Sequence, residues 1–381
     1  MLEFFLNKKP LYYDEIDYSR MPRVYSKVKS KLKIPKIIHL IGTNGKGTTG
    51  RFLAQALNSL SFNVGHYTSP HILEFNERIW QNGSNVSTGL LNEKHLELLK
   101  LLSSDDANSL SYFEYTTLLA IMLFQGCDYV VLEAGLGGEY DATAVFENIL
   151  TLVTPIDKDH EAFLGDTIEK IATTKLNAIQ KYAIIASQPN KEVYDIAKMI
   201  EKNNSVSIKQ VDSFIDEDDE KKIQKIREDN SLETYLVNNL RLSIAALKFL
   251  SLDYSSDDFI KSRLFGRLTQ FRPNVIIDVG HNVLAAKSIY ESLKESKYTL
   301  VYNSYKDKHY EEILRILKPI IIDVELIEIE DSRIESLEVM QKVLKELDLK
   351  YSSFIKTKED KNYLVFGSFS VIEMFLKEYV G

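Results

Sequence analysis

Short apolar runs alternate with stretches of helical spacing along most of the chain. In the first two thirds, the apolar runs cover residues 37–41, 129–133, 149–153 and 182–186. Polar residues or apolar positions at helical spacing follow each of them, as in residues 49–60. This alternation predicts an α/β fold in which helices flank a parallel sheet. In open sheets of this kind, ligands bind at the carboxyl ends of the strands.

A second alternating series occupies the last third of the chain. Its predicted strands are 275–278, 299–302, 320–327 and 363–366, and its predicted helices include 284–296 and 310–317. A chain of 381 residues also exceeds what one compact core usually holds. We therefore predict two domains, residues 1–266 and residues 267–381, although no Pro-rich or Gly-rich linker marks the junction.

The loop at residues 42–48, Gly-Thr-Asn-Gly-Lys-Gly-Thr, is the most informative stretch of the chain. Glycines let backbone N–H groups approach phosphate oxygens, and the N-terminus of the following helix favours negative charge. Lys46 can reach terminal phosphates, and the Thr48 hydroxyl can ligate Mg²⁺. The predicted nucleotide contacts are Thr43, Asn44, Gly45, Lys46, Gly47 and Thr48. Because the spacing departs from G-x-x-x-x-G-K-[ST], a glycine-rich turn stays open as an alternative for this loop alone.

Composition narrows the class of protein. The chain is 44% hydrophobic and 27% charged, as ordinary soluble proteins are, and it shows no basic leader or long apolar stretch. The single cysteine excludes an internal disulfide. A net charge of −8 disfavours a broad nucleic-acid surface. We expect a cytoplasmic monomer that binds neither nucleic acid nor membrane, with a solvated loop or helix face in the charged run 212–229.

Two polar residues follow other apolar runs. Glu133 ends one run just before a glycine-rich segment, and His160 lies beyond the run 149–153. A carboxylate at a strand end can hold Mg²⁺ directly or through water, and a neutral imidazole can also bind a metal. The alternatives are a solvent-facing glutamate and a histidine that packs or lies on the surface.

Six further segments carry a resemblance to a known family. They are Tyr67-Thr68-Ser69-Pro70-His71, residues 75–79, residues 132–138, Asp141-Ala142-Thr143, Asp159-His160 and Asp278-Val279-Gly280-His281-Asn282. Together with the loop they closely resemble the folylpolyglutamate synthase/dihydrofolate synthase family, within the Mur-ligase superfamily of ATP-dependent amide ligases. The resemblance extends from about residue 17 to residue 369. It implies an N-terminal P-loop ATPase-like domain and a smaller, Rossmann-like C-terminal domain that ligates glutamate.

The resemblance also implies a set of metal ligands. Glu133, His160 and Ser69 match Mg²⁺ ligands of the family, beside Thr48 of the loop. Lys175 matches a lysine that reacts with CO₂ to form a carbamate, which requires a neutral amine and hence a lowered pKa. On sequence alone an exposed helix face explains this lysine. The family continues Ala-Gly-Ile after it, whereas this chain continues with residues 176–179, Leu-Asn-Ala-Ile.

Four more positions match the family's ATP contacts, and they are Asn239, Arg267, Asp278 and His281. By its residue type alone, Asn239 could cap a helix that begins there. Arg267 suits phosphate oxygens because its planar guanidinium can pair with two of them.

Seven positions match substrate contacts of the family. Phe113, Glu114, Tyr140, Asp141 and Ala142 resemble the pterin site, and Lys306 and Asp307 resemble a loop that receives glutamate. Flat aromatic rings and a carboxylate suit a ring that stacks and donates N–H bonds. Position 144 is Ala where the family has Asn, and residues 17–20 fall near a further pterin segment.

The resemblance implies an ATP- and Mg²⁺-dependent ligase that joins L-glutamate to dihydropteroate and extends reduced folates through an acyl phosphate. Lys46, Lys175 and His160 are the expected catalytic residues. Two alternatives stay open, a Mur-type ligase of a cell-wall precursor and a non-catalytic nucleotide-binding switch. The switch would leave Glu133, His160 and Lys175 without a shared purpose.

Overall fold

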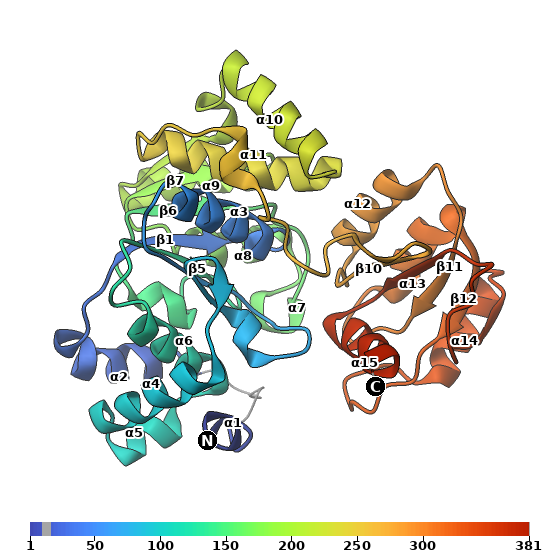
Figure 1. Ribbon diagram of the computed structural model, residues 1–381, viewed down its shortest axis with the longest axis horizontal. Coiled ribbons are helices and arrows are strands. Elements are labelled where there is room, and N and C mark those ends of the chain that lie inside the picture. Colours follow the sequence, from blue (N-terminus) through green and yellow to red (C-terminus); the bar gives the residue numbers. More distant parts are fainter. Residues whose placement is uncertain (10–16, 381) are drawn as a thin grey trace. The chain divides into compact units, whose positions relative to one another are not determined.

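The computed structural model describes residues 1–9 and 17–380, which form two compact units, Met1–Ser262 and Arg263–Gly381 (Figure 1). The division lies four residues before the boundary that the sequence suggested after Gly266. Arg263 belongs to the second unit because its guanidinium donates hydrogen bonds to the carbonyl oxygens of Arg267 and Leu268.

An eight-stranded sheet forms the centre of the first unit, in the order β4-β3-β2-β5-β1-β6-β7-β8. The strands are β1 (Lys36–Ile41), β2 (Val64–Tyr67), β3 (Ile79–Gln81), β4 (Ser84–Asn85), β5 (Tyr129–Glu133), β6 (Leu150–Val153), β7 (Tyr182–Ile185) and β8 (Ser207–Gln210). At one edge, β3 pairs antiparallel with both β2 and β4, and the other neighbouring strands of this sheet pair parallel. The four predicted apolar runs each form a strand, so the predicted parallel sheet is confirmed.

Helices cover both faces of this sheet (Figure 1). They are α1 (Leu2–Leu6), α2 (Arg20–Val28), α3 (Lys46–Ser59), α4 (Thr88–Leu101), α5 (Ser104–Ser109), α6 (Tyr112–Leu123), α7 (Glu161–Leu164), α8 (Ile168–Leu176), α9 (Glu192–Asn204), α10 (Glu217–Asp229) and α11 (Thr234–Phe249). In β1, Ile37 joins the core under α4 and α6, whereas Ile38 and Leu40 join the core under α3 and α11. Burial on both faces explains why these strands are continuously apolar.

Two helices begin earlier than the sequence indicated. α3 begins at Lys46 rather than at residue 49, because Gly45 takes a left-handed conformation and accepts the first helical bond, from Thr49 N at 2.9 Å. The prediction that Asn239 opens a helix is wrong. α11 starts at Thr234, and Asn239 lies inside it on a buried face.

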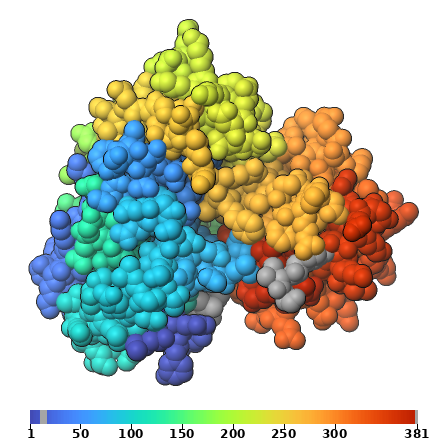
Figure 2. Space-filling view, viewed as in Figure 1, coloured from blue at the N-terminus to red at the C-terminus, as the bar shows by residue number. Residues whose placement is uncertain are grey.

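Most of the charged run at residues 212–229 forms the helix α10. Asp216 caps the helix by accepting hydrogen bonds from the backbone N–H groups of Asp218 and Asp219. Lys248 of α11 pairs with Asp216 at 2.7 Å and with Asp219 at 2.8 Å, so ion pairs fix the helix on the first unit. Figure 2 shows this yellow-green segment projecting from the surface, where its charged side chains can contact water.

The second unit contains a six-stranded sheet in the order β13-β12-β11-β14-β10-β9. Its elements are β9 (Thr269–Arg272), β10 (Val275–Asp278), α12 (Val283–Leu293), β11 (Tyr298–Tyr302), α13 (Tyr310–Leu317), β12 (Ile321–Leu326), α14 (Leu337–Glu346), β13 (Tyr351–Ser353), β14 (Tyr363–Phe366) and α15 (Phe369–Val380). All neighbouring pairs are parallel except β9 with β10. This arrangement confirms the predicted smaller α/β unit.

Residues 1–9 and 17–380 include no helix that combines the length and the apolar character needed to cross a membrane.

Candidate active site

Two lysine ammonium groups converge on one backbone carbonyl at the end of the central strand. Nζ of Lys46 and Nζ of Lys175 each donate to the carbonyl oxygen of Gly42 at 3.0 Å. Lys46 lies in the first turn of α3, and Lys175 lies in α8, 133 residues beyond Gly42 in the chain. The fold therefore gathers two lysine side chains at the glycine loop, and Lys46 supplies the positive charge that an anion-binding site requires.

The Lys175 side chain is buried rather than exposed on a helix face. Only 4% of the residue is accessible to solvent. Burial, and then the nearby Lys46 charge, lower the pKa of Lys175 to about 7, against the opposing effect of Asp159 and Asp141. Burial thus favours the neutral amine of Lys175 over its charged form. The neutral amine that a carbamate needs is available at this position.

The backbone of the glycine loop is fixed by the strand next to it. The N–H groups of Thr43 and Asn44 both donate to the Pro155 carbonyl, and the Thr43 hydroxyl donates to the Asp157 carbonyl at 2.9 Å. Gly42 has φ +135°, and a Cβ atom there would lie 2.1 Å from Oγ1 of Thr154. Only glycine fits this position, which brings the loop close to β6.

Glu133 and the segment that contains Ser69 meet at the ends of β5 and β2. Both the Thr68 hydroxyl and the Ser69 backbone N–H donate to Oε2 of Glu133, the latter at 3.3 Å. Glu133 is 5% exposed, so the solvent-facing alternative is wrong. Thr68 was missed by sequence reasoning, although it lies inside the Tyr-Thr-Ser-Pro-His segment that was singled out.

His160 precedes the short helix α7 in a left-handed conformation, with φ 53°. Its backbone N–H donates to the Asp159 carboxylate at 2.9 Å. In the described ranges 1–9 and 17–380, no three His, Cys, Asp or Glu residues cluster as metal ligands would. This finding is compatible with the predicted set, because that set holds only Glu133 and His160 from those four types.

Asn239 of α11 faces the glycine loop. A Cβ atom on Gly45 would lie 2.3 Å from Oδ1 of Asn239. The amide is buried, and it approaches the residue that immediately precedes the first turn of α3. The structure therefore brings Asn239 to the predicted nucleotide loop from 194 residues away, and Ser243 one turn later donates to the Thr49 carbonyl.

Asp141 organises the loop that follows β5. Its Oδ2 accepts hydrogen bonds from the N–H groups of Gly135 and Leu136, both at 2.9 Å, and its Oδ1 accepts from Thr143. Burial raises the pKa of the Asp141 carboxyl, and these hydrogen bonds oppose that rise. The carboxylate is an anchor of the fold, and its predicted contact with a substrate stays a prediction.

His39 extends this network into the central strand. Its Nε2 lies 2.8 Å from the Thr143 hydroxyl, and burial lowers its pKa to about 4, so the ring is neutral. Sequence reasoning missed His39. The available signal was a single polar residue inside the apolar run 37–41.

Phe113 and Glu114 lie at the start of α6. Phe113 packs against the same loop, because a Cβ atom on Gly135 would lie 2.7 Å from its ring. Glu114 forms a capping box with Ser111 and pairs with Nε of Arg20 at 2.7 Å. Its carboxylate therefore stabilises the helix and holds α2, and its predicted ligand contact stays a prediction.

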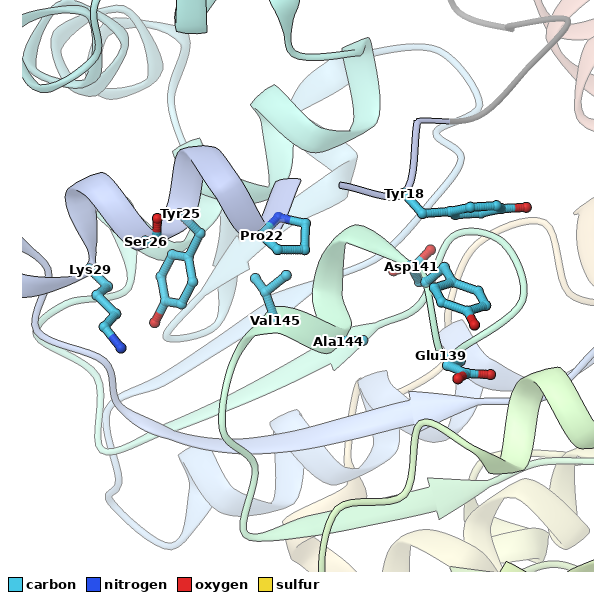
Figure 3. A pocket seen from close by; sticks show the side chains of 10 residues that line it. Tyr18, Pro22, Tyr25, Ser26, Lys29, Glu139, Asp141, Ala144 and Val145 are labelled. Atoms are coloured by element: carbon cyan, nitrogen blue, oxygen red, sulfur yellow. The ribbon is translucent and has the colours of Figure 1, made fainter. Parts of the chain in front are cut away.

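A pocket of about 370 Å³ opens between α2 and the loop at residues 139–145 (Figure 3). The rings of Tyr18 and Tyr140 lie 4.6 Å apart at this pocket, and Glu139 and Asp141 also line it. Tyr140 and Asp141 were predicted as substrate contacts. Ala142, Phe113 and Glu114 do not line the pocket.

In the second unit, two predicted nucleotide contacts lie near one aromatic ring, and a third, Asp278, holds the backbone nearby. The Arg267 guanidinium lies 5.4 Å from the centre of the Phe369 ring, and the His281 ring lies 6.5 Å from it. Asp278 accepts hydrogen bonds from the N–H groups of Leu268 and Gly280. Phe369 was missed, because nothing in the local pattern marks an aromatic residue as a platform for arginine.

Lys306 and Asp307 follow β11 in the second unit. Nζ of Lys306 donates to the Ser332 carbonyl at 2.7 Å, and Asp307 pairs with Lys308 at 3.1 Å. Lys306 and Lys308 line a separate polar pocket of about 500 Å³. Both ammonium groups have partners within the protein, and Glu311 and Glu312 also line this pocket, so the predicted glutamate contact stays a prediction.

Comparisons with known proteins decide the family. The Mur ligase middle domain family matches residues 41–250. The dihydrofolate synthase/folylpolyglutamate synthase of Haemophilus influenzae is 31% identical, over 81% of this chain and 77% of the relative. The crystal structure of Helicobacter pylori folylpolyglutamate synthetase is 39% identical with a TM-score of 0.81, covering 100% of this chain and 98% of that one. This chain belongs to the dihydrofolate synthase/folylpolyglutamate synthase family.

The Bacillus subtilis relative of the same printed name is 29% identical, over 79% of this chain and 78% of the relative. Membership in the family confirms that the chain is an enzyme, and it places the chain within the Mur-ligase superfamily.

The residues present fit a polyphosphate with a divalent cation. The first N–H groups of α3 have no carbonyl partner within the helix, and two ammonium groups lie at the same loop. Thr48 and Glu133 are both buried and offer the oxygen donors that Mg²⁺ prefers. Thr48, Glu133, Ser69 and His160 are therefore suitable residues for holding the cation.

Proposed function

We propose that this enzyme joins L-glutamate to dihydropteroate, and to reduced folates, with ATP as the phosphoryl donor. The observation that carries the proposal is the pair of lysines at the Gly42 carbonyl, at the end of the strand next to the one that ends in Glu133. The Lys46 cation and a second lysine with a lowered pKa, beside a carboxylate, suit a reaction that transfers a phosphoryl group to an acid.

Nucleotide binding is assigned to the glycine loop and to α11. The first turn of α3 receives the phosphates, with backbone contacts from Thr43, Asn44, Gly45 and Gly47 and a charged contact from Lys46. Asn239 faces this loop across Gly45 and holds the nucleotide on that side. A bound Mg²⁺ would neutralise the charge on the phosphate oxygens.

The chemistry then has two steps. An oxygen of the acceptor carboxylate attacks the γ-phosphorus of ATP, the bond to the β-phosphate oxygen breaks, and an acyl phosphate and ADP form. The glutamate amine next attacks the acyl carbon, loses a proton, and displaces phosphate. Lys46 balances charge that develops on the phosphoryl oxygens, so positioning and electrostatics supply the rate enhancement.

Lys175 is proposed to react with CO₂. The neutral amine forms a bond to the carbon of CO₂ and releases a proton, which leaves an anionic carbamate. A pKa of about 7 supplies the neutral amine, and Lys46 and the cation site compensate the new negative charge. The carbamate would give the site another oxygen donor beside Thr48, Ser69, Glu133 and His160.

The pocket in Figure 3 is the proposed acceptor site. Its two tyrosine rings suit a flat heterocycle, and the Glu139 carboxylate can accept an N–H bond that such a ring donates. Phe113 and Glu114 at the start of α6, and Ala142 within the loop, are proposed as further substrate contacts. Lys306 and Asp307 are proposed to receive glutamate, and Arg267, Asp278 and His281 are proposed to contact the nucleotide.

We also propose domains of 1–266 and 267–381, a monomer, a cytoplasmic location, and no binding to nucleic acid or membrane. An acidic net charge of −8 supports the absence of a nucleic-acid surface. Size-exclusion chromatography with light scattering tests the monomer, since a mass of twice 43.8 kDa would contradict it.

One assay tests the proposed reaction. Purified enzyme with ATP, Mg²⁺ and L-glutamate should release ADP only when dihydropteroate or a reduced folate is added, and mass spectrometry should show the acceptor gaining one glutamate. Testing the two acceptors separately shows which ligations occur. ADP release without an acceptor, or a product from a cell-wall precursor instead, would contradict the proposal.

Gly45→Ala is expected to raise the KM for ATP about tenfold and to lower the free energy of unfolding by roughly 1–2 kcal/mol. Gly45 has φ +90°, which L-residues rarely adopt, and the added methyl would lie 2.3 Å from Asn239. Urea unfolding and ATP titration measure both effects. Gly126→Ala is the control, because a Cβ atom there would have nothing within 4 Å. Equal results for the two variants would remove the steric explanation.

A further inference from the structure

The loop at residues 135–141 joins two parts of the enzyme that the proposed reaction uses. It begins just after Glu133, and it ends at Tyr140 and Asp141 on the wall of the pocket in Figure 3. Asp141 ties the two ends of the loop together through the N–H groups of Gly135 and Leu136. The middle of the loop is held from outside, by α8.

Three contacts connect the middle of this loop to the end of α8 that carries Lys175. The backbone N–H of Glu139 donates to the Thr174 carbonyl at 2.9 Å, and Nδ2 of Asn177 donates to Oε2 of Glu139 at 2.9 Å. A Cβ atom on Gly138 would lie 2.6 Å from the Lys175 carbonyl oxygen. The loop therefore lies directly on the backbone of Lys175.

Glu139 has two roles in this arrangement. Its side chain lines the pocket, and its carboxylate is the acceptor for Asn177. Asn177 is the residue immediately after α8 and lies two positions beyond Lys175. One hydrogen bond therefore joins the pocket wall to the same helix end from which Lys175 reaches Gly42.

We propose that Glu139 and Asn177 form a positioning pair that fixes the acceptor pocket relative to Lys175. The inference rests on the proposed function, because it assigns the pocket to the acceptor. Without the pair, the loop still has its backbone bond to Thr174, but the pocket wall is free to shift relative to the lysine. Acceptor binding then loses the preorganisation that this hydrogen bond supplies.

Asn177→Ala tests the pair through substrate kinetics. We expect a fivefold to tenfold rise in the KM for dihydropteroate, about the net effect of losing one intramolecular hydrogen bond, with the KM for ATP changed less than twofold. Glu139→Gln should leave the KM for dihydropteroate close to the wild-type value, because the glutamine amide oxygen still accepts a hydrogen bond from Asn177. Glu139→Ala alone should also raise this KM, and the double variant Asn177→Ala/Glu139→Ala should raise it by less than the two single effects combined.

A matched control separates this effect from general loss of stability. Gln224→Ala removes another amide–carboxylate hydrogen bond, to Glu228 within α10, and should leave every KM unchanged. Thermal unfolding of each variant accompanies the kinetics. A KM for ATP that rises as much as the KM for the acceptor would show a structural role and overturn the proposal.

A second measurement does not depend on the proposed reaction. Mass spectrometry follows acetylation of Lys175 by acetic anhydride in the enzyme without substrates, and Asn177→Ala should accelerate it severalfold while Gln224→Ala does not. Unchanged labelling overturns the link between loop and lysine. Changed labelling with an unchanged acceptor KM overturns the positioning role. If the wild-type enzyme releases no ADP, the proposed function is refuted instead. The labelling result still tests whether the loop is coupled to Lys175.

Discussion

Lys46→Met should lower kcat for acceptor-dependent ADP release by roughly a hundredfold to a thousandfold, the effect of removing one preorganised group that stabilises developing charge. Methionine keeps the length and the apolar stem of lysine but removes the ammonium group. The charge on the transferring phosphoryl group would then lose its closest side-chain cation at the loop. Steady-state kinetics with a coupled ADP assay measure the change.

The controls for Lys46 separate its charge from its place in the fold. Lys198→Met removes an exposed lysine of α9 that pairs only at the surface with Asp195, and it should leave kcat unchanged. Lys46→Arg keeps the charge in a larger, planar group and should retain part of the activity. If Lys46→Met had the same kcat as the wild type, Lys46 would not stabilise the transferring phosphoryl group.

Lys175→Ala should lower kcat by about a hundredfold or more, because it removes both the amine and any carbamate formed on it. Added formate or acetate should restore part of the activity, since a small carboxylate can occupy the space and supply the lost negative charge. Removing CO₂ from the buffers should lower the activity of the wild-type enzyme, because the carbamate on Lys175 would then be lost. A variant that no carboxylate rescues, with a wild type indifferent to CO₂, would contradict the carbamate.

The lowered pKa of Lys175 also predicts how stability depends on pH. The folded pKa is about 7 and the ordinary value is 10.5, so between these two values the unfolded chain binds more protons than the folded one. The wild-type free energy of unfolding should therefore rise with pH across this window relative to Lys175→Met, by up to about 1.4 kcal/mol per pH unit. Below pH 7 the difference should become constant.

Urea unfolding of both proteins in CO₂-free buffers at pH 7, 8 and 9 measures this difference. The comparison between two variants cancels the titration of all other groups. A constant difference across the window would show that Lys175 keeps its ordinary pKa in the folded state, and the pH argument for its neutral amine would fail.

Local sequence was sufficient for the elements that carry the site. Apolar runs predicted β1, β5, β6 and β7 to within about one residue at each end. The glycine loop and Glu133 fell at the carboxyl ends of strands, because a parallel sheet brings those ends to one edge. The start of α3 was missed, since the left-handed conformation of Gly45 places the first helical bond three residues earlier than the apolar pattern suggests.

Longer-range contacts decided what these residues do. Sequence spacing indicated an exposed helix face for Lys175, yet packing buries it against Gly42 and thereby lowers its pKa. The same holds for Asn239, whose type suggested a cap and whose place inside α11 turns it toward Gly45. A Glu139 to Asn177 hydrogen bond could not be foreseen, because nothing local relates two residues 38 positions apart.

The sequence by itself determined the α/β fold class, the two alternating series, the phosphate-type loop and the family. These features depend on hydrophobic periodicity, on glycine residues and on ordered motifs, all of which involve residues close together in the chain. Tertiary structure alone decided which charges share a carbonyl, which carboxylates anchor the fold and which line a pocket. Burial and proximity set these properties, and both depend on how distant segments pack.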